Sequence, residues 1–346
     1  MDTCEAFERI VETERELLPL IRQLPVEDWP LIRQCLWFEL INPSTPAEPR
    51  PVHPRLTERI AAAVREAAQA SHILNSINIE SALLFFSRVT YLTSLPDGSQ
   101  FDRVIDPLVL AASHPPNCTK YYLTPTGVND LGKLHLPAQP TGIDLLPRVA
   151  SRLTVPFRYR VDTTFNTCLH ELSVRLGVTD RKLRSGFNAQ RLAYEDWYRF
   201  GLKLFAHYRK VRRIFVAAWY FPDSMGLIAA ARQYGIESID VQHGKQGPYQ
   251  AMYAGWTWIP ANGFPNLPDK YWCWGSPSCE HILRSSPDRS THRPFAGGYP
   301  WLGWYRDNLW PDKNLAQPCS ATHRVLITLQ PPQGANDQPI PSALVQ

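Results

Sequence analysis

The sequence predicts an α/β fold in which a parallel, Rossmann-like sheet is flanked by helices and preceded by an extra helical region. Residues 214–220 (IFVAAWY) form an unbroken apolar run, which is typical of a strand covered on both faces. A helical pattern from Gln190 precedes this run, and a second helix and strand follow it up to Val241. This alternation favours a parallel sheet, because parallel strands need long crossover connections.

The amino-terminal region has the pattern of helices. Residues 5–24 place apolar side chains on one side of an amphipathic helix, and a second helix is expected at 29–41. Residues 43–54 (PSTPAEPRPVHP) are expected to form a stiff, extended linker. Thr57 is suited to cap a third helix. We therefore expect residues 1–55 to form a helical extension and a proline-rich linker.

The main domain is expected to span residues 56–310, and its first half has β-α-β spacing. Residues 82–86 have the pattern of a strand, and a helix is expected at 101–112. Pro107 must bend this helix or lie in its first turn. Residues 120–123 then form the next strand. Two strands separated by a helix in this way are expected to pair in parallel.

The second half of this domain shows the clearest pattern. Asp223 or Ser224 is suited to cap a helix at 225–234, and Gly235 suits a left-handed helix end. The strand at 236–241 follows directly.

Two further strands are expected downstream, at 270–274 and 293–296. Between them, Pro277 occupies the favoured first position of a short helix. The domain is expected to end near residue 310. Residues 311–346 are expected to form a linker and the first strand, 323–330, of a truncated second domain.

Composition excludes several functional classes. The net charge of +4 over 346 residues is too small to indicate nucleic-acid binding. Seven scattered cysteines suit a reducing compartment, which predicts a cytoplasmic protein. No signal peptide and no apolar run of about 20 residues is present, so any membrane association would be peripheral, at the inner face of the cytoplasmic membrane.

Motifs for metals and cofactors are also missing. Cys273, Cys279 and His281 lie close in sequence but lack a fourth ligand and a Cys-x-x-Cys pair. No glycine-rich phosphate loop, dinucleotide-binding turn or nucleophile elbow occurs. The sequence therefore predicts neither a metal nor a cofactor.

Polar and aromatic residues follow three predicted strands, where open parallel sheets bind their ligands. The candidate binding residues are Tyr220 and Asp223 after the first strand, Gln242, His243, Gly244, Lys245, Gln246 and Tyr249 after the second, and Gly298 and Tyr299 after the third.

His243 is the candidate catalytic residue. An imidazole titrates near neutrality, so it can act as a general base or as a charged donor to phosphate. Gln242 offers a donor and an acceptor, and Lys245 adds a positive charge suited to phosphate. The alternative is a buried turn, in which His243 bonds a carbonyl group and Gly244 is present only for its backbone angle. For Tyr249 the alternatives are a ligand-stacking ring and a cover for the sheet edge.

A strand, IFVAAWY, and three ordered segments after it carry a family resemblance: FPDSMGLIAAARQYGIESIDVQHGKQGPY, LPDKYWCWG and FAGGYP. Together they resemble bacterial surface-polysaccharide glycosyltransferases of the GT-B class, which have two Rossmann-like domains. A more distant likeness is to the glycerophosphotransferases of teichoic-acid synthesis, which carry a His-Gly at the corresponding strand end. The resemblance covers roughly residues 190–330 well.

This resemblance implies a glycosyltransferase of capsule or lipopolysaccharide synthesis. Residues 56–310 would be the amino-terminal half of the GT-B architecture and would bind a saccharide or lipid-linked acceptor. The second domain would bind a nucleotide-sugar donor, and a basic cleft would bear the diphosphate charge without a metal. His243 matches the family's histidine and inherits its suspected role as base or phosphate contact, while Gln242 and Gly244 match the surrounding motif.

One departure from the family concerns the second domain. In the family a strand like RVLITLQPP begins that domain, and here 16 residues follow Gln330. We therefore expect the isolated chain to be inactive unless a partner chain supplies the missing half. Two other functions stay open: a non-catalytic carbohydrate-binding or scaffold domain of a capsule-assembly complex, and a nucleotide-sugar epimerase.

Overall fold

The computed structural model describes residues 2–42, 80–112, 118–123, 132–140, 162–284 and 290–309. The expected linker at 43–54, the helix that Thr57 would cap and the strand at 323–330 lie outside the described residues. The chain divides into two compact units, Met1–Trp304 and Tyr305–Gln346.

A parallel sheet of seven strands forms the centre of the first unit, in the order β5-β4-β1-β6-β7-β8-β9. Its strands are β1 Leu83–Ser87, β4 Cys118–Tyr122, β5 Gln139–Pro140, β6 Arg213–Ala217, β7 Glu237–Val241, β8 Lys270–Cys273 and β9 Arg293–Ala296. A small antiparallel pair joins β2 (Leu92–Ser94) to β3 (Gln100–Asp102). The prediction of a parallel, Rossmann-like sheet is confirmed.

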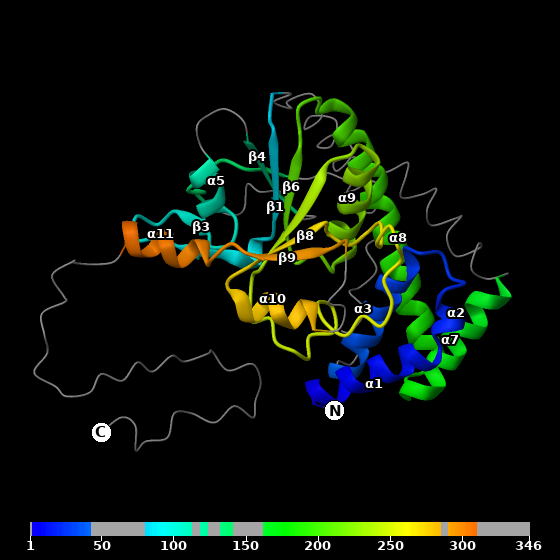
Figure 1. The fold of residues 1–346 in the computed structure, drawn as a ribbon. Coiled ribbons are helices and arrows are strands. Elements are labelled where there is room, and N and C mark those ends of the chain that lie inside the picture. The colour runs from blue at the N-terminus through cyan, green and yellow to red at the C-terminus, as the bar shows by residue number, and fades with distance from the viewer. Residues whose placement is uncertain are drawn as a thin grey trace, which may run out of the picture. The chain divides into compact units, whose positions relative to one another are not determined.

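Helices cover both faces of this sheet (Figure 1). The helices among the described residues are α1 Thr3–Glu16, α2 Leu18–Ile21, α3 Asp28–Ile41, α5 Asp106–Ala112, α7 Thr163–Leu176, α8 Asp180–His207, α9 Pro222–Gln233, α10 Ser276–Leu283 and α11 Pro300–Asn308, with a 3₁₀ turn, η1, at Val89–Tyr91. Leu84 and Val216 share an apolar cluster with α8 and α9, whereas Phe85 and Phe215 share another with α5. The alternation of side chains along each strand thus supplies two separate cores.

The first strand-to-helix segment differs from the sequence prediction. The helix expected from residue 101 begins only at Asp106, because Gln100–Asp102 pairs with β2. The carboxylate of Asp102 then accepts the backbone N–H groups of Val104 (3.0 Å) and Ile105 (3.1 Å), which turns the chain into α5. Pro107 lies in the first turn of α5, where its missing N–H costs nothing.

Two other helix predictions also need correction. The single helix expected at 5–24 is divided into α1 and α2 at Leu17. The helix α9 begins at Pro222 and its N-cap residue is Phe221, with no side-chain cap, so Asp223 and Ser224 do not cap it. Pro222 supplies the preset backbone angle that starts the helix instead.

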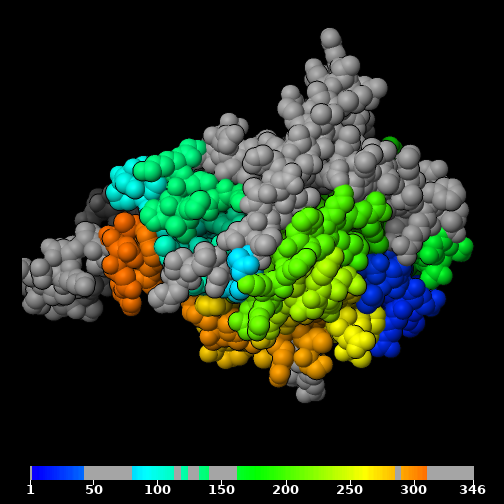
Figure 2. Space-filling view, turned by 90° about the horizontal axis from the view of Figure 1, so that it is seen from above, coloured from blue at the N-terminus to red at the C-terminus, as the bar shows by residue number. Residues whose placement is uncertain are grey.

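The amino-terminal helices pack into the same core as the sheet and its covering helices. Figure 2 shows their blue surface directly against green and yellow segments from later in the chain. Arg33 on α3 and Glu14 on α1 form an ion pair in which both side chains are fully buried. Arg33 also donates to the carbonyl oxygens of Ala251 and Ala254, each at 3.0 Å. This ion pair therefore ties the helical extension to the loop between β7 and β8.

Close packing of α9 on α8 fixes the position of the turn that precedes α9. A Cβ atom at Gly226 would lie 2.7 Å from the carbonyl oxygen of Tyr194 and 2.7 Å from the backbone nitrogen of Tyr198. Only glycine allows the two helix backbones to approach so closely.

Candidate functional site at the carboxyl edge of the sheet

The strand order reverses between β1 and β6, which is where the candidate site lies. From β1 the chain crosses through α5 to β4 on one side, whereas from β6 it crosses through α9 to β7 on the other. Crossovers in opposite directions place α5 and α9 on opposite faces of the sheet. Open α/β sheets bind ligands at such a switch point.

A charged pair spans this switch point. Arg88 follows β1 directly, and its guanidinium forms an ion pair with Asp223 in the first turn of α9. Both side chains keep about a sixth of their surface exposed (17% and 16%). The guanidinium lies 4.2 Å from the ring centroid of Phe221, which holds it over an apolar surface. Arg88 is therefore a fixed, accessible cation at the edge of the sheet.

His243 lies beside this pair, two residues beyond the end of β7. Its Nε2 is 3.2 Å from the hydroxyl oxygen of Tyr220, which follows β6. Its ring centroid is 5.4 Å from that of Tyr91, which follows β1, and 5.8 Å from that of Tyr220. All three residues are partly exposed. The ends of three neighbouring strands thus converge on one imidazole.

The surroundings of His243 favour a neutral ring. Desolvation lowers the pKa of His243 to about 4, and the charge of Arg88 acts in the same direction, while the Val241 carbonyl opposes both. Burial raises the pKa of Tyr220 to about 12, so its hydroxyl keeps its proton and can donate to Nε2. A ring of this kind can accept a proton at neutral pH, but it cannot act as a cationic phosphate donor without first gaining one.

A strained turn after β6 brings Tyr220 to this position. Ala218 has a φ of 63°, in the left-handed region that non-glycine residues rarely adopt, and it is fully buried. The carboxylate of Asp240 accepts the backbone N–H of Trp219 at 3.0 Å and the hydroxyl of Tyr253 at 2.9 Å. Burial raises the pKa of Asp240 to about 8. Asp240 therefore holds the turn that presents Tyr220 to His243.

The hydrogen-bonding groups of Gln242 are paired with other residues of the protein. Its side-chain oxygen accepts the backbone N–H of Trp274 at 2.7 Å, and its amide donates to the carbonyl of Gly244 at 2.8 Å. Its own carbonyl accepts the indole N–H of Trp274 at 2.8 Å. Gln242 therefore joins the ends of β7 and β8.

The other residues predicted in this loop lie in different environments. Lys245 is exposed near the edge, and Gln246 is buried with its amide nitrogen unpaired among the described residues. Gly244 has no left-handed angle, and a Cβ there would meet nothing within 4 Å, so the alternative in which Gly244 is present only for its backbone angle is wrong. Tyr249 packs edge-on against Phe7 of α1, with ring centroids 5.7 Å apart, and is 43% exposed.

The segment after β9 carries the last two predicted residues. Gly298 has a φ of 85°, which favours glycine, and its carbonyl accepts the indole N–H of Trp272 at 2.9 Å. Tyr299 stacks on Trp274 with ring centroids 4.0 Å apart and planes 27° apart. The structure thus connects this segment to Gln242 through Trp274.

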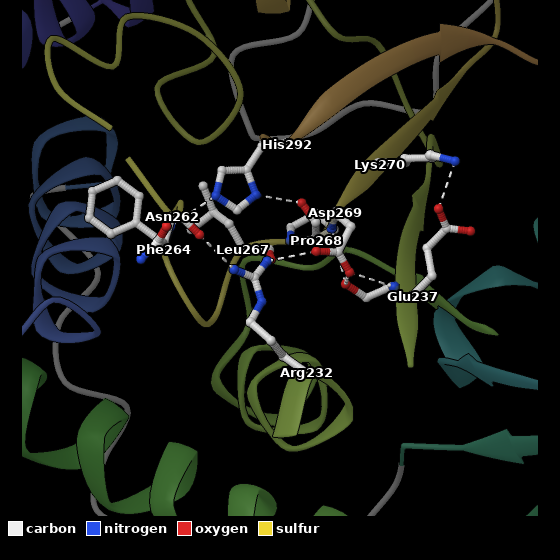
Figure 3. A network of polar contacts seen from close by, with 10 residues as sticks. Arg232, Glu237, Asn262, Phe264, Leu267, Pro268, Asp269, Lys270 and His292 are labelled. Carbon is white, nitrogen blue, oxygen red and sulfur yellow. Dashed lines mark hydrogen bonds and ion pairs between the residues drawn. The ribbon is translucent and has the colours of Figure 1, made fainter. Parts of the chain in front are cut away.

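A second histidine, at the opposite edge of the sheet, shows how a structural imidazole is held (Figure 3). His292 is fully buried, with Nδ1 2.6 Å from the carbonyl oxygen of Pro268 and Nε2 accepting the backbone N–H of Phe264 at 2.9 Å. Asp269 beside it accepts from Arg232 and Ser238, each at 2.8 Å. Both nitrogens of His292 are thus committed to the fold. His243 is held at Nε2 by the hydroxyl of Tyr220, and the carbonyl of Val241 also interacts with its ring.

Two pockets lined by described residues lie away from this edge. One, of about 400 Å³, includes Glu80 and Arg212 near the amino ends of β1 and β6. The other, of about 510 Å³, lies between α1 and residues 255–257. Neither pocket is lined by a histidine. In the described ranges, no group of three or more His, Cys, Asp or Glu side chains is arranged to hold a metal, and no helix is long and apolar enough to cross a membrane.

Sequence reasoning missed Arg88, Tyr91 and Asp240. Arg88 could have been found, because it is the first charged residue after the strand expected at 82–86. Tyr91 and Asp240 carried no signal, since their roles depend on which strands become neighbours.

No protein-family model, curated protein or solved structure matches this chain. The functional argument therefore rests on the geometry of the carboxyl edge.

Proposed function

We propose that this chain acts in a glycosyltransferase of bacterial surface-polysaccharide synthesis, and that the carboxyl edge of its sheet binds the saccharide acceptor. The observation that carries the proposal is the neutral imidazole of His243, a partly exposed residue next to the strand-order switch point, beside the cation of Arg88. A base and an anion-binding group at one edge are the two groups needed to move a sugar from a nucleoside diphosphate to a hydroxyl.

The proposed reaction uses His243 as general base. The acceptor hydroxyl loses its proton to Nε2 while its oxygen forms a bond to the anomeric carbon of the donor sugar. The bond from that carbon to the diphosphate oxygen breaks, and the nucleoside diphosphate leaves with the electron pair. Because the Tyr220 hydroxyl lies 3.2 Å from Nε2, it must turn aside or be replaced by the acceptor hydroxyl.

Charge at the site supports the same assignment. A bare imidazole with a pKa of about 4 is a weak base. A diphosphate bound near Arg88 would place negative charge beside the ring, which raises the pKa of His243 toward neutrality. The side chain of Arg88 keeps about a sixth of its surface exposed (17%), so its guanidinium can meet a diphosphate in addition to its pairing with Asp223. Donor binding would therefore activate the base.

The test measures transfer from labelled nucleotide sugars to a panel of oligosaccharide acceptors, with the donor-binding half supplied as a second chain because the isolated chain is expected to be inactive. We expect His243→Ala to lower transfer by roughly 10²–10⁴-fold, the usual contribution of a positioned general base. His170→Ala, which removes an exposed histidine on α7, is the matched control and should leave transfer unchanged. A folded His243→Ala protein that transfers sugar as fast as the wild type refutes the assigned role.

One observation favours a second function, a carbohydrate-binding domain without chemistry. The low pKa of His243 suits a hydrogen-bonding ring as well as it suits a base. This alternative predicts saturable oligosaccharide binding with no turnover at any donor concentration.

A further inference from the structure

A pocket of about 510 Å³ lies between α1 and the loop that joins β7 to β8. Phe7, Val11 and Arg15 line it from α1, where their spacing of four residues places them on one side of the helix. Trp256 lines it from the loop, and Arg284, the C-cap residue of α10, lines it from a third segment. The volume is in the range of small-molecule sites, and the lining extends for about 12 Å along α1.

The fold fixes the walls of this pocket. Gly255 has a φ of 72°, and a Cβ there would lie 2.6 Å from both the ring of Phe7 and a methyl group of Val11. The loop backbone therefore lies directly against α1, as only glycine allows. The backbone N–H of Thr257 donates to the buried carboxylate of Glu14 on α1 at 3.3 Å. A pocket formed in advance binds its ligand at little cost in conformational entropy.

The charged residues that line the pocket are both arginines. Arg15 and Arg284 are exposed, and neither forms an ion pair within the part of the chain that the structure describes. No aspartate or glutamate lines the pocket, and Glu8 and Glu12 of the same helix are outside the lining set. The pocket therefore presents two accessible positive charges, which favour an anionic ligand.

Groups that could recognise a sugar or a nucleobase are scarce in this pocket. Trp256 is 1% exposed and the guanidinium of Arg33 lies 4.5 Å from its ring centroid, so the indole offers no open face for stacking. Apart from the two arginines, Thr257 is the only lining residue with a polar side chain. The hydroxyl groups of a sugar or the edge of a base would therefore stay largely unpaired. Val11 and Leu18 add aliphatic surface, which suits a chain of CH₂ groups.

We propose that this pocket binds an amphiphile that has a single hydrocarbon chain and an anionic head group, either a phosphate or a carboxylate. The chain packs on the apolar wall, and the head group pairs with the arginines through charge-assisted hydrogen bonds. A guanidinium has several N–H donors in a planar fork, which matches the oxygens of both acids. The inference goes beyond the proposed function, because neither His243 nor Arg88 lines the pocket.

Calorimetric titration with hexyl, octyl and decyl phosphate, each below its micelle concentration, tests the pocket. We expect affinity to rise by roughly three- to fourfold for each added CH₂ group, the effect of removing one methylene from water. Inorganic phosphate should bind far more weakly than decyl phosphate, and octyl trimethylammonium should not bind. Octanoate replaces the phosphate by a carboxylate on a similar chain, so its affinity relative to octyl phosphate shows which acid the arginines prefer.

A double variant tests the role of the arginines. Arg15→Gln combined with Arg284→Gln removes both charges at exposed positions, so it should unfold at the same temperature as the wild type. It should bind octyl phosphate at least roughly tenfold more weakly, because charge-assisted hydrogen bonds are lost. Arg181→Gln is the matched control, since Arg181 is an exposed arginine of α8 with no ion pair among the described residues and does not line the pocket. It should bind like the wild type.

Four outcomes overturn the proposal. They are no binding of any alkyl phosphate, equal affinity for inorganic and decyl phosphate, equal losses in the double variant and in Arg181→Gln, and tighter binding of uridine diphosphate than of decyl phosphate. The last outcome would assign the pocket to a nucleotide.

Failure of the proposed function gives a different result. His243→Ala should bind octyl phosphate like the wild type, because His243 does not line the pocket. Chain-length-dependent binding without sugar transfer removes the transferase and leaves the amphiphile site. Sugar transfer that depends on His243, without alkyl phosphate binding, removes the amphiphile site and leaves the transferase.

Discussion

We expect acidification to lower the free energy of unfolding of this protein because of His243. The pKa of this residue falls from 6.5 to about 4 on folding, mainly because of desolvation. Above pH 6.5 the ring is neutral in both the folded and the unfolded chain, so it contributes nothing. Between pH 6.5 and 4 the unfolded chain binds a proton that the folded chain does not, so the free energy of unfolding falls as the pH falls. Below pH 4 both forms are protonated and the loss levels off.

The size of this loss follows from the two pKa values. The difference corresponds to about 3 kcal/mol in the free energy of unfolding. Because the ring is partly exposed, this figure is an upper bound. His243→Asn cannot titrate in this range, so it lacks the pH-dependent contribution and keeps a side chain of similar polarity.

Urea unfolding of the wild type and His243→Asn, at several values between about pH 7.5 and about pH 4, measures the effect. We expect the wild type to lose up to about 3 kcal/mol more than the variant as the pH falls. Subtracting the two curves cancels every other titrating group. A difference that stays constant over the whole range would show that the ring is not desolvated and would refute the assignment of a neutral base.

Three further predictions concern the framework of the site. Arg33→Ala leaves Glu14 buried without its partner and should cost about 3–5 kcal/mol in urea unfolding, whereas a loss below about 1 kcal/mol would contradict the integral role of the amino-terminal helices. Gly226→Ala drives a Cβ into the backbone of α8 and should lower stability by about 1–3 kcal/mol in thermal unfolding, with Gly244→Ala, which meets no neighbour, as the silent control. Asp240→Ala leaves the Trp219 N–H buried without an acceptor and should lower the free energy of unfolding in urea by about 1–3 kcal/mol. Asp240→Asn keeps an acceptor oxygen and should recover most of this loss. Equal losses in both variants would show that the hydrogen bond does not hold the turn.

Local patterns predicted much of the secondary structure. The strands expected at 214–220, 236–241 and 293–296 match β6, β7 and β9 to within a few residues. Gly235 has the expected left-handed angle, with a φ of 65°, and Pro277 lies in the first turn of α10. These features depend on neighbours in the chain, so the sequence specifies them directly.

Features that depend on distant partners were not predicted. The helix expected at 101–112 begins late because its first residues pair with β2, and nothing in the local pattern reveals that pairing. Asp223 or Ser224 was expected to cap the helix after β6, but α9 begins at Pro222, so both residues lie inside its first turn. There Asp223 pairs with Arg88, a partner from a distant segment that no local pattern reveals.

The sequence alone determined that an imidazole and several aromatic rings follow parallel strands, since strand ends and turn residues are encoded locally. Only the tertiary structure decided that β1 lies beside β6, which brings Arg88 and Tyr91 to His243. It also decided the charge of the ring, because the pKa of His243 depends on how much water its neighbours exclude. Strand order and desolvation both arise from contacts between residues far apart in the chain, and these contacts exist only once the chain has folded.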